Sequence, residues 1–142
     1  MLALVHMTAM ASPVFVVNLP WVLPAVKGKT TEAFMLLQSS EGAALVGARC
    51  PNAASVVIIE PGAKKAARDR LPLPPGEPVL LAPGKYRLRL AHIDRTLKLG
   101  DRVPLELIIE TTDGARQTVA VDMEVRRRSA LDDEAHEHHH HD

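Results

Sequence analysis

Apolar and polar residues alternate in short runs along most of this chain, and such alternation is typical of β-strands with one buried face. Two of the longer runs, Val103–Glu110 and Gln117–Arg126, flank Asp113-Gly114, a pair that predicts a hairpin because glycine readily adopts positive φ. The clearest run, Lys85–Leu90, places three apolar side chains on one face and three basic side chains on the other: Tyr86, Leu88 and Leu90 against Lys85, Arg87 and Arg89.

Shorter apolar and β-branched runs predict further strands, separated by turns that contain proline and glycine. The chain has 11 Pro and 8 Gly, and it shows neither an internal repeat nor a segment of helical periodicity. We therefore predict an all-β fold, an antiparallel sandwich or barrel. The additional strands are expected at Val14–Val17, Glu32–Ser39, Leu45–Ala48, Ser55–Ile59 and Val79–Leu81.

Charge is unevenly distributed along the 142 residues, although the formal net charge is zero. Residues 131–142 carry five acidic side chains and no Lys or Arg, which leaves 17 basic against 12 acidic side chains in the rest. This bias is mild, and few aromatic side chains are present to stack on bases, so we predict no nucleic-acid partner. Because Cys50 is the single cysteine, no intramolecular disulfide can form.

Composition divides the chain into three parts, with a β domain over residues 14–128. Residues 1–13 are uncharged, and Ala9-Met10-Ala11 before Ser12 is similar to a signal-peptide cleavage site; the alternative is a leader that results from a misassigned start. Neither reading provides a membrane span, since the apolar stretch is too short. Residues 129–142 are polar and acidic, and we predict a disordered tail.

Four segments of the domain, in order and spacing, resemble the PCu(A)C family of periplasmic copper chaperones. The resemblance implies a cupredoxin-like Greek-key β-barrel, an exported, periplasmic location, a role in copper handling and a copper-protein partner. The segments are Asn18-Leu19-Pro20-Trp21, Leu81-Ala82-Pro83-Gly84-Lys85-Tyr86, Leu97-Lys98-Leu99-Gly100-Asp101 and Val103-Pro104-Leu105.

The copper ligands that the resemblance implies are replaced in this chain. Family members hold Cu(I) with two His and two Met, which are soft and borderline ligands. The matching positions here are Ile59, Arg87 and Arg89, and the shortened connection Pro61–Arg70 contains no Met in place of the fourth ligand. Guanidinium groups do not deprotonate and repel a cation, so we expect the inherited Cu(I) site to be lost.

The tail contains the densest group of metal-ligating residues. Neutral imidazoles interleaved with carboxylates suit Cu(II) or Zn(II), which makes the tail a candidate metal site; the alternative is a purification tag. A native tail favours a copper-handling protein, whereas a tag favours a metal-free domain that acts as an interaction or scaffold module. The candidate ligands are His136, His138, His139, His140 and His141.

Two other groups of residues are weaker candidates. Lys85, Arg87 and Arg89 form either an anion or partner contact or an ordinary solvent face. His92 is a candidate for a substitute metal site with Cys50, Met35 or Met123, although methionines on strands are typical of a core. His92 is the single His of the domain, no nucleophile has a His and an acid nearby, and the chain has no Gly-rich phosphate loop, so we predict that it is not an enzyme.

Overall fold

The computed structural model describes residues 14–132 except 63 and 65, and these residues form ten strands. Helical structure in the described part is limited to a single turn at residues 130–132. The strands are β1 (Phe15–Val22), β2 (Thr31–Ser39), β3 (Ala43–Arg49), β4 (Ser55–Ile59), β5 (Ala67–Arg68), β6 (Leu71–Leu73), β7 (Val79–Leu81), β8 (Arg87–Ala91), β9 (Arg102–Thr111) and β10 (Arg116–Val125).

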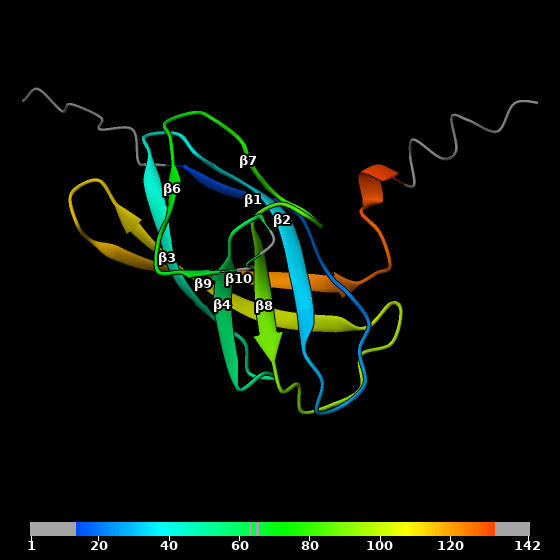
Figure 1. The fold of residues 1–142 in the computed structure, drawn as a ribbon. Helices are drawn as coiled ribbons and strands as arrows, with labels where there is room; N and C mark the ends of the chain where they lie inside the picture. The colour runs from blue at the N-terminus through cyan, green and yellow to red at the C-terminus, as the bar shows by residue number, and fades with distance from the viewer. Residues whose placement is uncertain (1–13, 63, 65, 133–142) are drawn as a thin grey trace, which may run out of the picture.

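The strands form one nearly closed sheet in the order β5-β4-β8-β2-β1-β10-β9-β3-β6, with β7 also paired to β2 (Figure 1). All pairs are antiparallel except β1 with β10. The prediction of an all-β, barrel-like antiparallel fold is therefore confirmed. Non-consecutive neighbours such as β1 with β10 and β2 with β8 bring distant parts of the sequence together.

The interior of the barrel is built from aliphatic side chains and methionine, because the chain has few aromatic residues. On β9, every second side chain from Val103 to Ile109 is buried, as the alternation predicted. Met35 and Met123 are buried in this core, so their prediction as packing residues is confirmed. Cys50 is also part of it.

Strand β1 is longer than the sequence indicated, because the chain passes through a bulge and continues. The pattern predicted an end at Val17, before Asn18 and Pro20, but the strand runs to Val22. Leu19 has a φ of 51°, and the register against β2 shifts between Asn18 and Trp21. The bulge redirects the strand, so that its last residues pair with β10 while its first residues pair with β2 alone.

The turn between β9 and β10 has the geometry that Asp113-Gly114 predicted. Gly114 has a φ of 87°, and its N–H donates to the carbonyl of Thr111 over 2.9 Å. The Asp113 carboxylate accepts hydrogen bonds from the Thr111 hydroxyl and, over 3.2 Å, from the Ala115 N–H. The residues Thr112 to Gly114 therefore form a three-residue loop that closes on itself.

A second, smaller group of buried apolar side chains lies on the other side of the sheet from the main core. Trp21 and Phe34 are opposite one another in the β1–β2 register, and their ring centroids are 4.5 Å apart. Their neighbours Val22 and Ala33 point into the main core, so the two rings point out of it. Ile59 is buried outside the main core in the same way, next to its core neighbour Ile58.

Candidate functional site

The strand register brings together the three positions at which the family resemblance implied copper ligands. Ile59 on β4 is directly opposite Arg87 on β8, and Arg89 is two residues further along β8. Directly opposed residues of an antiparallel pair project from the same face, as do residues two apart on one strand. All three side chains therefore share the outer face of the sheet, the face of Trp21 and Phe34 described above.

Arg87 is buried at this face, with only 7% of its side chain exposed. Its Nε donates to the carboxylate of Glu32 on β2, which is 30% exposed, and its Nη1 donates to the carbonyl oxygen of Lys85 over 3.0 Å. The alternative of an ordinary solvent face formed by Lys85, Arg87 and Arg89 is wrong for Arg87, because its side chain is buried. A contact of these residues with an external anion or a partner stays a prediction. Both faces of β8 are covered at this point, and the guanidinium is used within the protein.

The connection after β4 supplies a different ionic contact on the opposite face. Arg68 on β5 is directly opposite Ile58, and its Nη1 lies 2.5 Å from the hydroxyl of Tyr86 and 3.8 Å from the carboxylate of Glu60. The guanidinium also lies 5.6 Å from the centre of the Tyr86 ring. These contacts cover the edge of the core next to Tyr86, and they occupy the stretch in which the family's fourth ligand was expected.

These residues do not fit a Cu(I) ion. Ile59 has no donor atom, and the Arg87 guanidinium is a fixed positive charge that already neutralises Glu32. Copper placed between them would meet an apolar side chain and a buried cation, neither of which is a ligand. The described residues also contain no group of three or more His, Cys, Asp or Glu side chains arranged to hold a metal ion.

The other candidate ligands are dispersed or lie outside the described part. His92 is exposed and has a φ of 51°, at the end of β8. Burial raises the pKa of the Cys50 thiol, which disfavours the thiolate that a metal requires. The five candidate ligands of the tail all lie outside the described residues: His136, His138, His139, His140 and His141.

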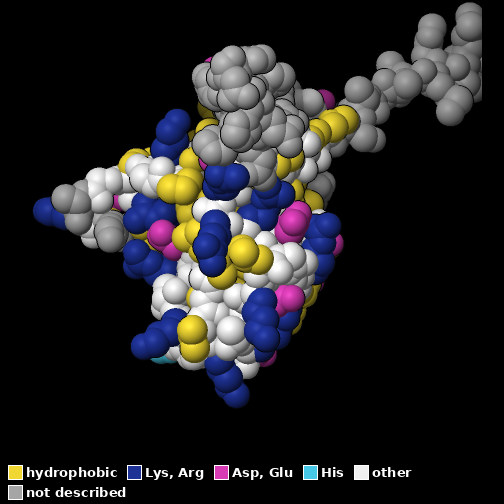
Figure 2. Space-filling model, turned by 90° about the vertical axis from the view of Figure 1, so that its right-hand side faces the viewer, with side chains coloured by type: hydrophobic (Ala, Val, Ile, Leu, Met, Phe, Trp, Pro, Cys, Tyr) yellow, Lys and Arg dark blue, Asp and Glu magenta, His cyan; other side chains and the backbone are white. Residues whose placement is uncertain are grey.

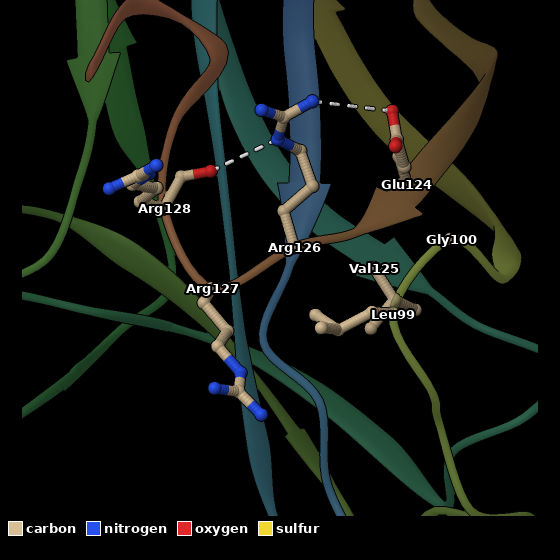
Figure 3. Close-up of a pocket in the computed structure, with 7 residues that line it drawn as sticks. All are labelled: Leu99, Gly100, Glu124, Val125, Arg126, Arg127 and Arg128. Carbon is tan, nitrogen blue, oxygen red and sulfur yellow. Dashed lines mark hydrogen bonds and ion pairs between the residues drawn. The ribbon is translucent and has the colours of Figure 1, made fainter. Parts of the chain in front are cut away.

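A shallow depression of about 400 Å³ lies where β10 ends. The sequence pattern did not indicate this depression, because it shows residues 126–128 only as the end of a strand. It is lined by Leu99, Gly100, Glu124, Val125 and the three residues 126–128 (Figure 3). Arg126 extends toward Glu124, with 3.6 Å between the charged groups, while Arg127 points away. On this side of the molecule, Lys and Arg side chains are spread among hydrophobic ones (Figure 2).

Solved structures of PCuAC domains have the same fold as this chain. The apo PCuAC domain from PmoF1 is 21% identical, with a TM-score of 0.70 over 80% of this chain and 94% of that one. The Cu(I) form of DR1885 from Deinococcus radiodurans is 25% identical, with a TM-score of 0.61 over 79% of each chain. The chain thus has the cupredoxin-like fold of PCuAC domains, as predicted.

Sequence comparison identifies the particular family. The model of the family described as "Putative lipoprotein LpqE-like" matches residues 15–125, which is most of the chain. The chain belongs to this family. None of the curated proteins compared with the chain matches it.

Proposed function

We propose that this chain is an exported copper-handling protein of the PCuAC type whose inherited Cu(I) site no longer binds metal. The observation that carries the proposal is the buried Arg87–Glu32 ion pair beside Ile59. In this pair a permanent cation lies at a position for which the family resemblance implies a copper ligand. Metal, where it is bound, is held by the tail through His136, His138, His139, His140 and His141.

The family description and the fold support the exported location and the copper-related role. The family is described as lipoproteins, a class that is exported, and we propose the periplasm or its equivalent as the compartment. A structural neighbour is named as a Cu(I) form, and we propose that the partner of this chain is a copper protein. We propose no enzymatic activity. No helix in the described residues is both long and apolar enough to cross a membrane.

Ligand chemistry supports Cu(II) or Zn(II) as the cargo of the tail. Imidazole and carboxylate ligands suit these ions, while the tail lacks the thioethers that favour Cu(I). Each imidazole must be neutral to bind, so affinity is expected to decrease as the pH falls through about 6.5. Ordering a chain segment costs conformational entropy, which makes the expected affinity modest compared with that of a preformed site.

Calorimetric titration of two chains tests the proposal. The full chain is expected to bind Cu(II) and Zn(II), and a chain that ends at Arg128 is expected to bind neither while keeping its melting temperature within about 2 °C. A full-length variant with all five tail histidines replaced by Ala is the matched control, because it keeps the tail's length and acidity. Tight copper binding by the chain that ends at Arg128 would contradict the proposal.

A second candidate function, a metal-free interaction module, is favoured by the same ion pair. The Arg87–Glu32 pair is part of the packing of the domain. The fold can therefore be stable although this position supplies no metal ligand. If neither the full chain nor the tail variant binds metal in the titration, this second function replaces the first. The domain surface, and not a metal, would then be the functional element.

A further inference from the structure

Most of strand β10 has one free edge in the described part of the chain. β10 pairs with β9 from Arg116 to Glu124, but on its other side it pairs with β1 at Glu124 and Val125 alone. In the part of the chain that the structure describes, no strand pairs with the outer edge of residues 116–122. The β9–β10 hairpin also extends away from the rest of the sheet (Figure 1). An edge of this kind presents unpaired N–H and C=O groups to a further strand.

Backbone hydrogen bonds alternate in direction along the hairpin, and this alternation shows which residues of β10 have N–H and C=O groups at the free edge. Thr111 N–H donates to the Ala115 carbonyl, so the odd-numbered residues of β10 direct their backbone groups toward β9. Arg126 N–H donates to the Val22 carbonyl of β1, which confirms that even-numbered residues direct theirs to the other side. The free edge therefore consists of the backbone groups of four residues: Arg116, Thr118, Ala120 and Asp122.

The bulge in β1 leaves room beside this edge. Because β1 changes direction at Leu19, its first half stays with β2 and does not follow β10. A depression of about 270 Å³ remains between the two strands, lined by Phe15, Val17 and Pro20 on one side and residues 119–122 on the other. Most of the residues that line it are apolar, and their exposed backbone groups suit the pairing of an added strand.

We propose that this edge pairs antiparallel with the same edge of a second copy of the chain, about a two-fold axis at Val119. In this register Arg116 is opposite Asp122 of the second copy, and Thr118 is opposite Ala120 of the second copy. It is the one register in which all four free residues pair among themselves, each with its backbone groups directed at its partner. A two-fold interface requires such self-complementarity.

Charge complementarity favours the second copy as the occupant. Directly opposed residues share a face, so the register forms two Arg116–Asp122 ion pairs between the copies. Within one chain both residues are well exposed: Arg116 lies 3.5 Å from Glu110, and Asp122 lies 4.0 Å from Arg102. Both side chains keep solvent-facing atoms that a second copy can reach. On the other face Val119, which lines the depression, meets its symmetry equivalent.

Sedimentation equilibrium of the full chain, followed by charge reversal, tests the proposal. The average mass is expected to rise from 15.4 kDa toward twice that value as concentration increases to about 1 mM. Asp122→Arg and Arg116→Asp each place like charges opposite one another and should raise the dissociation constant about tenfold. The double variant R116D/D122R exchanges the two charges and should restore it. A chain that stays monomeric, or a double variant no better than the single ones, would overturn the proposal.

Amide hydrogen exchange provides a second test that does not depend on charge. Thr118 and Ala120 amides should become protected as concentration rises, while the Val119 amide, which is directed at β9, is protected throughout. Thr118→Pro removes one outward N–H without removing a β9–β10 hydrogen bond, and it should abolish the mass increase. Protection of Thr118 and Ala120 that is independent of concentration would mean that a segment of the same chain covers the edge, and the proposal would be wrong.

Discussion

The ion pair between Arg87 and Glu32 shows how a charged side chain can become part of the packing at a position where the family resemblance implies a ligand. Burying a pair of charges has a free-energy cost, because both charges lose their hydration. Replacing only one partner destabilises the fold further, because the other charge stays buried and unpaired. The two partners differ in exposure: 7% of the Arg87 side chain and 30% of the Glu32 side chain are accessible. Water can therefore hydrate a lone Glu32 better than a lone Arg87.

This asymmetry leads to a prediction at the residue scale. Glu32→Gln should lower the free energy of unfolding by about 3 kcal/mol, more than Arg87→Met, which should lower it by about 2 kcal/mol. The double variant should lose less than the sum of the two, because no unpaired charge remains. Urea unfolding at pH 7 measures all three differences.

Arg89→Met is the matched control for this prediction. Arg89 lies on the same strand and face and is directly opposite Glu32, yet the described contacts include no ion pair for it. Its replacement should change the free energy of unfolding by less than about 0.5 kcal/mol. An equal loss from Arg87→Met and Arg89→Met would show that the pair has no special role.

The β9–β10 hairpin offers a prediction at the scale of the element. Hydrogen bonds from the Thr111 hydroxyl, and then from the Ala115 N–H, lower the pKa of the Asp113 carboxyl below its ordinary value of 3.8. A pKa lowered by folding means that the ionised carboxylate stabilises the fold. This contribution is complete above the ordinary pKa and is lost as the pH falls through the lower pKa of the folded state.

Asp113→Ala should therefore destabilise the chain at pH 7, and the difference from the parent chain should shrink as the pH falls below 3.8. The difference between the two chains is the quantity to measure, by urea unfolding from pH 7 to about 2.5. Glu110 titrates in the same region, since a hydrogen bond from Arg70 lowers its pKa, and it contributes equally to both chains. A constant difference across this range would contradict the prediction.

The strands also show how far local pattern determines structure. Ser55–Ile59 and Val79–Leu81 have the predicted bounds, because an apolar run between turns is a purely local signal. The predicted end of β1 was wrong. A proline such as Pro20 usually ends a strand, but here the positive φ at Leu19 creates a bulge that accommodates the proline. No local pattern reports such a bulge.

At the scale of the whole molecule, the proximity of the positions that match the family's ligands was predictable, and their environment was not. Motif spacing placed Ile59 and Arg87 together, and the β4–β8 register agrees. The burial of Arg87 depends on Glu32, which is 55 residues away in the sequence, and on a second apolar group outside the barrel. Alternation alone treats the outer face of a strand as solvent, so it missed both.

The register also allows a copper site to be designed at the matching positions, which tests whether the scaffold can hold it. Ile59→His, Arg87→His and Arg89→Met place two imidazoles and one thioether on one face. Ala67 on β5 is directly opposite Ile59, so Ala67→Met adds a second thioether on the same face. In a chain that ends at Arg128, this four-residue variant should bind Cu(I) at least about tenfold more tightly than the three-residue variant.

The matched control replaces Arg68 in place of Ala67. Arg68 is directly opposite Ile58, whose side chain is in the main core, so a methionine there projects from the other face and should add nothing. Competition with a coloured Cu(I) chelator measures the affinities, and thermal unfolding confirms that each variant folds, since a histidine at buried position 59 lowers stability. Equal affinities with methionine at 67 and at 68 would show that this face is not the copper site of the fold, and the assignment of Ile59, Arg87 and Arg89 would then be wrong.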